Sequence, residues 1–513
     1  MLAAPAAGTA SQIDAVRKQA QAALDRRDPI AAEVPLRAAI RSGVPADALR
    51  AWLAQALIAR GDRAEARRVL GEGGFTPDSA GLGWRMRGQL ELVGGNLTGA
   101  AQAFDQAYRF TPNDANLWID IASLRFTGGE EAQAIEAAQR AVTLDPANPR
   151  GLSLRGALIR EQFGLAASLP WFEAGLRLKP EDPVLLGEYA ATLGDMGQYR
   201  AMLVVCRKLS AVDPKNVRSW YLQAVLAARA GKTDLARAIL LKTGKALRDV
   251  PAAIMLNGVL EYRAGNLNLA VEHFDRLSRM QPYNPQVRLM LARTLERQGD
   301  FRQIVQRFDG DARAPAAPPY LLDIVGRAWI ALGQPKLGAP YLSRVSKPER
   351  AGATTIAADL PLAALALRYR EGPNFAWNAV PYIRGLLTAG QGDDAQMVAD
   401  RLRDSNPGAS GSRLLAGDVR MIRGQSREAL ADYEAAATIR FNEPVLRRMD
   451  AALRALGRTG DANGMTSRYL AQNPSSIPAM KLLASAWEEQ GNAPEVERMA
   501  AALAARGQSV PLR

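Results

Sequence analysis

Residues 84–112 read WRMRGQLELVGGNLTGAAQAFDQAYRFTP, and residues 118–146 read WIDIASLRFTGGEEAQAIEAAQRAVTLDP. Trp84 and Trp118, the first residues of the two segments, are 34 positions apart. The same spacing joins four more pairs of matching residues: Gly95 and Gly129, Ala100 and Ala134, Ala107 and Ala141, and Pro112 and Pro146. A fixed period of this length indicates a chain built from repeated supersecondary units.

Glycine follows this period through much of the chain. It occupies eight of nine places in one column, and only Phe163 breaks the series: Gly61, Gly95, Gly129, Gly197, Gly231, Gly265, Gly299 and Gly333. Glycine makes up 44 of the 513 residues, so such a column does not arise by chance. Because glycine adopts left-handed backbone conformations without steric cost, the column predicts a turn that ends one helix and starts the next.

Small and large residues recur in the same phase. A first small column reads Ala20, Ala54, Gly88, Ala122, Gly156, Ala190, Ala224, Gly258, Ala292 and Gly326. A second, mostly small column includes Ala32, Ala66, Ala100, Ala134, Ala236 and Ala270, and larger residues follow it by four places, as in Leu36, Leu70, Phe104, Phe172, Leu240, Phe274 and Phe308. Small residues let two antiparallel helices approach closely, and the larger residue one turn further fills the space between hairpins.

These residues resemble the signature of the tetratricopeptide repeat (TPR), whose units are helix-turn-helix hairpins stacked into a superhelix. The resemblance implies an all-α, TPR-type superhelical solenoid of about 14 repeats. Less specifically, the arrangement resembles bacterial TPR proteins that support envelope or exopolysaccharide export. The TPR signature itself says little about function, because proteins with this fold bind many unrelated partners.

The repeats divide the chain into two series. About ten repeats share one phase in residues 1–347, the phase fails in an irregular joint at 348–375, and about four repeats follow in 376–513. The second series is marked by Gly390, Gly424, Gly457 and Gly491. A bend between the two series is a hypothesis that follows from the loss of phase, and the series leave no room for a separate catalytic domain.

Composition limits the classes of partner. Apolar residues make up 48% of the chain, charged residues 23%, and the formal net charge is +13. This charge favours an acidic protein or peptide partner. The alternative explanation is that the arginines simply form the solvent-exposed faces of the solenoid helices. The sequence contains no run of 18 apolar residues, so it predicts no membrane span. Residues 1–8 resemble the end of a signal peptide. Two locations therefore stay open: the periplasm, if the start of the sequence is truncated, and the cytoplasm.

Residues that carry chemistry are scarce. The chain has one histidine, His273, and one cysteine, Cys206. These two residues cannot supply a zinc site with four Cys or His ligands, and they exclude most pairs of a catalytic nucleophile with a base. We interpret His273 as a structural or surface residue and Cys206, in the large-residue column, as a buried filler. The sequence therefore predicts no catalytic residue, no metal site and no cofactor, and the protein is not expected to be an enzyme.

The resemblance implies that the inner face of each first helix forms a concave groove that binds the partner. The period places these polar and aromatic residues on that face: Arg85, Gln89, Asn116, Arg160, Tyr221, Arg229, Tyr262, Arg263, Arg293, Tyr320 and Arg327. Guanidinium groups bind carboxylates through two parallel hydrogen bonds, and tyrosine offers rigid contact area. Arginine is also common throughout this chain, which is the alternative explanation of the pattern.

We therefore expect a non-catalytic scaffold for protein interactions, with possible support of envelope or exopolysaccharide export. The alternative is a cytoplasmic peptide-binding co-chaperone or regulatory adaptor. RNA binding ranks last because the groove positions lack a base-reading pattern that recurs in each unit. The identity of the partner and the oligomeric state do not follow from the sequence.

Overall fold

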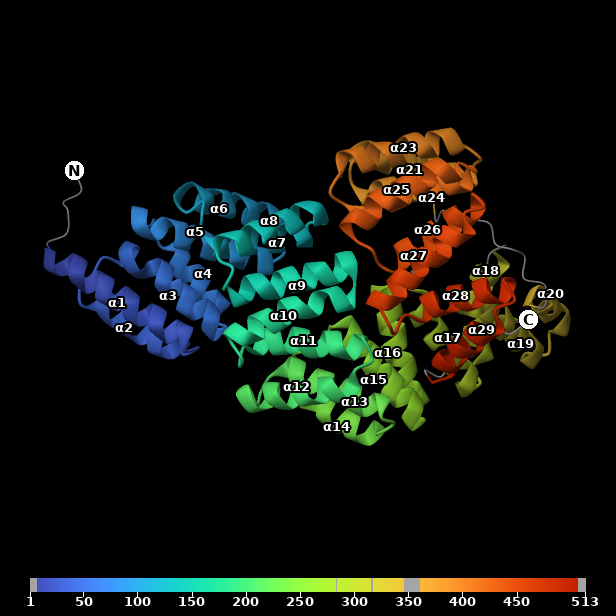
Figure 1. Cartoon of the computed structure of the whole chain (residues 1–513), viewed down its shortest axis with the longest axis horizontal. Helices are drawn as coiled ribbons and strands as arrows, with labels where there is room; N and C mark the ends of the chain where they lie inside the picture. Colours follow the sequence, from blue (N-terminus) through green and yellow to red (C-terminus); the bar gives the residue numbers. More distant parts are fainter. Residues whose placement is uncertain (1–6, 283, 315–316, 346–359, 506–513) are drawn as a thin grey trace. The chain divides into compact units, whose positions relative to one another are not determined.

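The computed structural model describes residues 7–282, 284–314, 317–345 and 360–505, and within these residues the regular secondary structure is entirely helical. The chain forms two compact units (Figure 1). Unit 1 comprises Met1–Ile159 and Gly408–Ser410, and unit 2 comprises Arg160–Pro407 and Gly411–Arg513. The all-α prediction is confirmed.

Unit 1 consists of consecutive antiparallel hairpins. Its helices are α1 (Ala7–Asp25), α2 (Pro29–Arg41), α3 (Ala46–Arg60), α4 (Arg63–Gly71), α5 (Pro77–Val93), α6 (Leu97–Phe110), α7 (Ala115–Thr127), α8 (Glu131–Leu144) and most of α9 (Pro149–Phe163). The odd-numbered helices are the first and the even-numbered ones the second helices of the hairpins, so the repeat predicted from the glycine column is a helix pair.

Unit 2 continues the series. It contains α10 (Leu165–Leu178), α11 (Pro183–Asp195), α12 (Tyr199–Val212), α13 (Val217–Arg229), α14 (Thr233–Leu241), α15 (Pro251–Ala264), α16 (Leu267–Met280), α17 (Pro285–Gln298), α18 (Phe301–Arg313), α19 (Pro319–Ala331) and α20 (Pro335–Val345). After the gap come α21 (Leu362–Glu371), α22 (Ala376–Thr388), α23 (Gly392–Ser405), α24 (Ser410–Ile422), α25 (Ser426–Ile439), α26 (Glu443–Ala455), α27 (Thr459–Gln472), α28 (Ile477–Glu489) and α29 (Ala493–Ala504). From α1 to α20 and from α22 to α29 the helices pair into ten and four hairpins, which confirms about 14 repeats.

The predicted joint at 348–375 is only partly irregular. Residues 346–359 lie outside the described residues, whereas the Ala and Leu-rich segment after Pro361 forms α21, which packs against α22. The prediction of irregular structure was wrong for residues 362–371. The 34-residue period did not reveal this short helix because it contains no glycine of the column. The bend at the joint stays a prediction.

The glycine column forms the turn inside each hairpin. All eight predicted glycines have a positive φ, between +73° at Gly231 and +92° at Gly61. The left-handed region costs a residue with a side chain about 1–2 kcal/mol, which explains the choice of glycine. At the exception, Phe163 extends α9 and the left-handed residue is displaced by one position to Gly164, with φ +105°.

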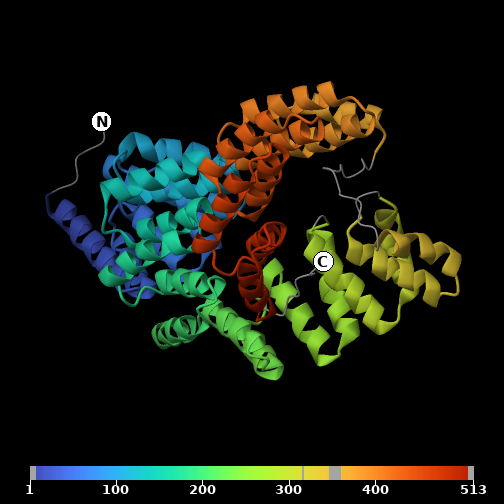
Figure 2. The same ribbon diagram turned by 45° about the vertical axis from the view of Figure 1, so that its right-hand side comes forward.

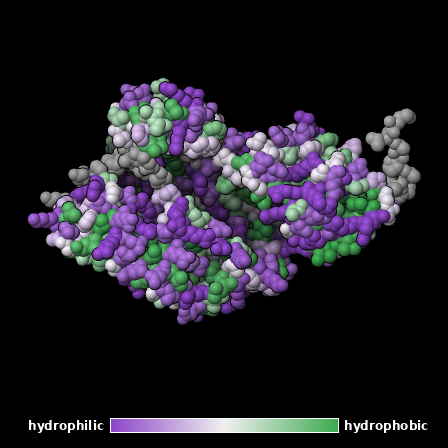
Figure 3. Space-filling view, turned by 180° about the vertical axis from the view of Figure 1, so that it is seen from behind, coloured by the Kyte–Doolittle hydropathy of each residue, from purple (hydrophilic) through white to green (hydrophobic). Residues whose placement is uncertain are grey.

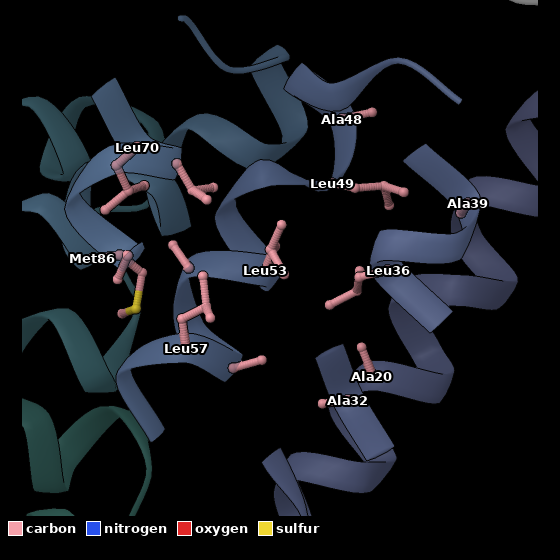
Figure 4. Packing of buried hydrophobic residues seen from close by; sticks show 14 of the residues in the cluster. Ala20, Ala32, Leu36, Ala39, Ala48, Leu49, Leu53, Leu57, Leu70 and Met86 are labelled. Carbon is pink, nitrogen blue, oxygen red and sulfur yellow. The ribbon is translucent and has the colours of Figure 1, made fainter. Parts of the chain in front are cut away.

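The small and large columns form the hydrophobic core. In the first hairpins of unit 1, Ala20 on α1 and Ala32 on α2 lie beside each other, and Leu36 projects toward α3 (Figure 4). All three side chains are fully buried. Alanine at the crossing brings the helices close together, and leucine one turn further on packs against the next hairpin, as the columns predict.

Glycine in the first small column faces an aromatic ring. A Cβ atom added at Gly88 would lie 2.9 Å from Cζ of Phe104 and closer still to two other ring atoms, and one added at Gly258 would lie 2.5 Å from the ring of Phe274. Where the small residue is Ala54, the partner in the large column is Leu70. The two columns therefore complement each other in volume.

Within unit 2, the corner between α9 and α10 packs against the last hairpins. The backbone N–H of Phe441 donates to the carbonyl of Glu161 over 3.1 Å, and the side chain of Arg440 forms an ion pair with Glu161 over 2.6 Å. Asn473 accepts a hydrogen bond from the N–H of Leu165 over 3.3 Å. Figures 1 and 2 show the orange-red α27 next to α10, with which it is in contact. Segments about 280 residues apart in sequence thus meet at the one position where the glycine column fails.

Candidate functional site

All predicted groove residues lie on first helices. Arg85 and Gln89 belong to α5, Asn116 to α7 and Arg160 to α9. The remaining residues lie on α13 (Tyr221 and Arg229), α15 (Tyr262 and Arg263), α17 (Arg293) and α19 (Tyr320 and Arg327). Arg85, Gln89 and Asn116 belong to unit 1, and the other groove residues belong to unit 2.

In unit 1 the groove residues bind one another through a carboxylate. Asp120 on α7 is buried, accepts a hydrogen bond from the amide of Gln89 over 2.6 Å, and accepts another from Arg150 over 3.0 Å. Arg85 is only 7% exposed and forms an ion pair with Asp114 over 2.5 Å. These polar residues link α5, α7 and α9, so Arg85 and Gln89 stabilise the contact between adjacent hairpins and have little capacity left for a partner.

The pairing of a carboxylate with an arginine recurs at a fixed spacing. Asp120 binds Arg150, Glu188 binds Arg218 over 2.6 Å, and Asp418 binds Arg448 over 2.7 Å. Each arginine follows its carboxylate by 30 residues and lies on the next first helix. Sequence reasoning missed these acidic partners, although a search for an acid and an arginine separated by 30 residues within the 34-residue period would have found them.

Glu188 on α11 connects three first helices of unit 2. It accepts hydrogen bonds from Arg218 and, over 3.2 Å, from Arg160, which also donates to Thr192. Burial alone would raise the pKa of Glu188, but the hydrogen bond from Arg218 and the charges of both arginines outweigh it and hold the pKa below its usual value. Glu188 is therefore a stable anion, and it neutralises Arg160.

Three arginines at the ends of first helices follow the period: Arg229, Arg263 and Arg297. Arg263 donates to the carbonyl of Ala228 over 2.7 Å, and Arg297 donates to the carbonyl of Tyr262 over 3.0 Å while it lies over the ring of Tyr262. Arg229 donates instead to the hydroxyl of Tyr199. A cation at a helix C-terminus is favourable by about 0.3–1 kcal/mol, so these residues join successive hairpins and keep their positive charge.

Arg293 on α17 differs from the other arginines of the predicted groove. It is exposed, and within the residues that the structure describes it forms no hydrogen bond or ion pair. Arg327 on α19 binds Asp323 through its Nε atom over 2.9 Å and lies 3.8 Å from Glu296. Tyr262 and Tyr320 are half-buried and pack against the hydrophobic core of α15–α20. The first-helix face of α15, α17 and α19 thus carries three guanidinium groups, at positions 263, 293 and 297, that are paired with no carboxylate among the described residues.

The single cysteine and the single histidine lie on second helices of unit 2. Cys206 is fully buried on α12, and burial raises the pKa of its thiol to about 11. His273 is half-buried on α16, and burial lowers its pKa. The predicted burial of Cys206 is confirmed, and the interpretation of His273 stays a prediction. Among the described residues, no group of three or more His, Cys, Asp or Glu side chains is placed to hold a metal ion.

The surface is mostly hydrophilic. On the face shown in Figure 3, hydrophobic residues form small separate patches. In the part of the chain that the structure describes, no helix combines the length and the apolar character needed to cross a membrane. Unit 1 also has a hollow of about 630 Å³ beside Trp84 and Arg87, in which the guanidinium of Arg87 lies 4.7 Å from the centre of the Trp84 ring.

Comparison with known families identifies the repeat. Models described as "Tetratricopeptide repeat" match residues 53–115, 115–148 and 255–302. The chain is 27% identical over 259 residues to Cellulose synthase 1 operon protein C of Komagataeibacter xylinus. That match covers 47% of this chain but only 19% of the relative, so the matched segment spans about a fifth of that protein's length.

Two solved structures are similar to this chain at low sequence identity. PilF of Pseudomonas aeruginosa is 18% identical with a TM-score of 0.36, and the match covers 42% of this chain and 99% of PilF. The human IFIT1 dimer with m7Gppp-AAAA is 16% identical with a TM-score of 0.40, covering 76% of this chain and 90% of IFIT1.

Proposed function

This chain belongs to the tetratricopeptide-repeat family, and from that premise we propose that it is a non-catalytic scaffold that binds an acidic protein segment on the first helices of unit 2. One observation carries this proposal: the guanidinium groups of Arg263, Arg293 and Arg297 are not neutralised by a carboxylate among the described residues. An acidic segment would complement this charge through bidentate hydrogen bonds. Arg293 is the central residue because its guanidinium makes no hydrogen bond there.

The other predicted groove residues have smaller parts in this proposal. Arg85 and Arg160 are bound to carboxylates of neighbouring hairpins, and breaking these pairs to bind a ligand would remove the arginine from Asp114 and leave Glu188 with Arg218 alone. Tyr262 and Tyr320 supply contact area beside the arginines. The site therefore extends along α15, α17 and α19.

A titration with a defined acidic probe tests the site. The probe is a fluorescein-labelled peptide of alternating glutamate and leucine, and the readout is fluorescence anisotropy. We expect Arg293→Glu to weaken binding at least tenfold, and Arg327→Glu to weaken it less because Arg327 already binds Asp323. Arg302→Glu is the matched control, since Arg302 is an exposed arginine on the second helix of the same hairpin. Equal binding by the Arg293→Glu variant and the control would refute the proposal.

A protein ligand is proposed rather than RNA. Recognition of RNA bases by helical repeats needs the same reading positions in each unit, and the residues at the groove positions vary between the repeats. The same titration with a labelled 20-nucleotide oligouridine supplies the comparison. We expect only weak binding that is lost at 200 mM salt, as for non-specific phosphate contacts. Tight, salt-resistant binding of the oligonucleotide would favour RNA.

We propose that the partner belongs to an assembly for envelope or exopolysaccharide export. Similarity to a protein of a cellulose synthase operon supports this role. The alternative is a cytoplasmic co-chaperone or adaptor that binds peptides. Fractionation of cells that express the gene from its mapped native start distinguishes the two: we expect the protein in the envelope or periplasmic fraction, and recovery only from the cytosol would favour the adaptor.

A further inference from the structure

Unit 1 contains a hollow of about 630 Å³ that is lined by residues of the second helices α4 and α6 and of the first helix α5. We call it the α4–α6 hollow. Its volume lies within the range of about 300–1,000 Å³ that is usual for sites of small ligands. The hollow is separate from the arginine face of α15, α17 and α19, because those helices belong to unit 2.

The short helix α4 explains why this space is open. Helix α4 has 9 residues, whereas α6 and α8, the second helices of the next two hairpins, have 14 each. Three glycines stand within four residues from Gly71 onward, and glycine is a poor helix former. A loop then leads to α5, and in this loop Phe75 packs against Trp84. The missing turns of α4 leave Trp84 and Arg87 of α5 only half-buried, and both residues line the hollow.

Arg87 is oriented by backbone carbonyls and aromatic rings. Its Nη2 atom donates to the carbonyls of Leu70 and Gly73, the second over 3.1 Å. Its guanidinium lies 4.7 Å from the centre of the Trp84 ring and 4.9 Å from that of Phe75. With the described residues it forms no ion pair, and its Nε and Nη1 atoms make no hydrogen bond and retain solvent-accessible surface. These two donors are therefore available to a ligand.

Burial and a second cation make the positive charge of Arg87 unfavourable. Burial lowers the pKa of Arg87, and the charge of Arg50 lowers this pKa further, whereas no carboxylate of the described residues raises it. Arg50 is itself buried, donates to the carbonyl of Gly74 and forms no ion pair in the described part of the chain. An anion beside Arg87 would offset both positive charges.

The rest of the lining adds further donors. Arg67 on α4 is exposed, donates to the carbonyl of Leu90 over 3.1 Å and forms no ion pair with the described residues. The indole N–H of Trp84 donates to none of them and retains solvent-accessible surface. The lining has one carboxylate, Glu91, whose Oε2 atom accepts a hydrogen bond from Asn96 over 2.7 Å. Two arginines and one glutamate give the lining a positive balance of charge.

We propose that the α4–α6 hollow binds a small organic anion, whose carboxylate or phosphate group is held by Arg67 and Arg87. Guanidinium groups bind either oxyanion through parallel hydrogen bonds. The side chains of Trp84, Leu70 and Leu90 supply an apolar wall for a ring carried by the same molecule. This proposal does not rest on the function proposed above, and each can fail without the other.

Probes that share a naphthalene ring and differ in charge test the preference for an anion. They are 1-naphthylacetate, 1-naphthyl phosphate, 1-naphthylmethanol and 1-naphthylmethylamine, and equilibrium dialysis against the full chain measures their binding. We expect both anions to bind about tenfold more tightly than the alcohol, and the amine to bind most weakly. The tighter of the two anions identifies the preferred oxyanion. Inorganic phosphate should bind about tenfold more weakly than naphthyl phosphate, because it has no ring to pack against the apolar wall.

A pair of variants on α4 tests the position of the site. We expect Arg67→Gln to weaken binding of both anions about tenfold and to leave binding of the alcohol unchanged. Arg63→Gln is the matched control, because Arg63 is an exposed arginine of the same helix that lies outside the lining, and it should bind all probes as the wild type does. Circular dichroism and the urea midpoint of each variant establish that it is folded.

Three results would overturn the proposal. Equal binding of the anions and the alcohol would indicate a purely apolar hollow, and equal weakening by Arg67→Gln and Arg63→Gln would indicate attraction by the overall charge. Absence of saturable binding of either anion would exclude the site. None of these results affects the acidic-peptide titration, which depends on Arg293 in unit 2.

Discussion

Replacement of Gly88 by alanine tests whether volume complementarity between the two columns holds the hairpins together. The added methyl group would overlap the buried ring of Phe104, and overpacking of this kind costs about 1–3 kcal/mol. The higher helix propensity of alanine offsets about 1 kcal/mol of that cost. In another repeat the same two columns hold Ala292 and Phe308, so the fold accommodates a methyl group opposite a phenylalanine when the surrounding side chains shift. We therefore expect the free energy of unfolding of the α5–α6 hairpin to fall by about 1 kcal/mol.

A second substitution should rescue the first. Phe104→Leu alone removes three buried carbons and should cost roughly 2 kcal/mol. The double variant recreates the natural pair Ala54 and Leu70 of the preceding repeat, and we expect it to lose only about 1 kcal/mol instead of the 3 kcal/mol that simple addition gives. The favourable coupling between the two positions is then about 2 kcal/mol.

Hydrogen exchange measured by mass spectrometry on peptides from residues 77–110 is the appropriate assay, because repeat arrays do not unfold in a single step. Gly71→Ala is the control, since a Cβ atom at Gly71 meets nothing within 4 Å. We expect this variant to be as stable as the wild type or more so. Equal protection in Gly88→Ala and the wild type, or a double variant whose loss is simply additive, would refute the reasoning.

Three further predictions concern other described residues. The hydrogen bond and charge of Arg218 lower the pKa of Glu188, so the ion pair stabilises the fold fully above the unfolded pKa of about 4.3 and loses this effect as the pH falls toward the lower folded pKa. Urea midpoints measured between pH 6 and 3 should therefore fall more steeply for the wild type than for Glu188→Gln. Parallel curves would contradict this prediction. Cys206 should react with Ellman's reagent at pH 8 only after denaturation, because burial raises its pKa to about 11, and labelling of the native protein within minutes would contradict its burial. Asp309→Ala should destabilise the α18–α20 region by about 3 kcal/mol, because Asp309 accepts hydrogen bonds from Trp329 over 2.8 Å and from Tyr341 over 2.7 Å. Unchanged hydrogen exchange in α18–α20 would argue against a structural role of Asp309.

The repeat architecture was readable from the sequence because each hairpin solves the same packing problem. Two helices that cross need a small residue such as Ala20 at the contact, a left-handed glycine such as Gly95 at the turn, and a large residue such as Phe104 facing the next hairpin. These requirements are local and recur every 34 residues. Helix α21 escaped prediction because it is short and contains no glycine of the column.

The sequence by itself determined the hairpins, their number and the helices on which the groove residues lie. Only the tertiary structure decided which arginines are available, because Arg85 is neutralised by residues about 30 positions away, whereas Arg293 has no partner among the described residues. The contact of the α9–α10 corner with α27 is likewise a tertiary feature: Leu165 and Asn473 are 308 residues apart, and no period relates them. Local packing rules repeat along a chain and leave a pattern, whereas the pairing of charges and the contact of distant hairpins depend on the path of the whole chain.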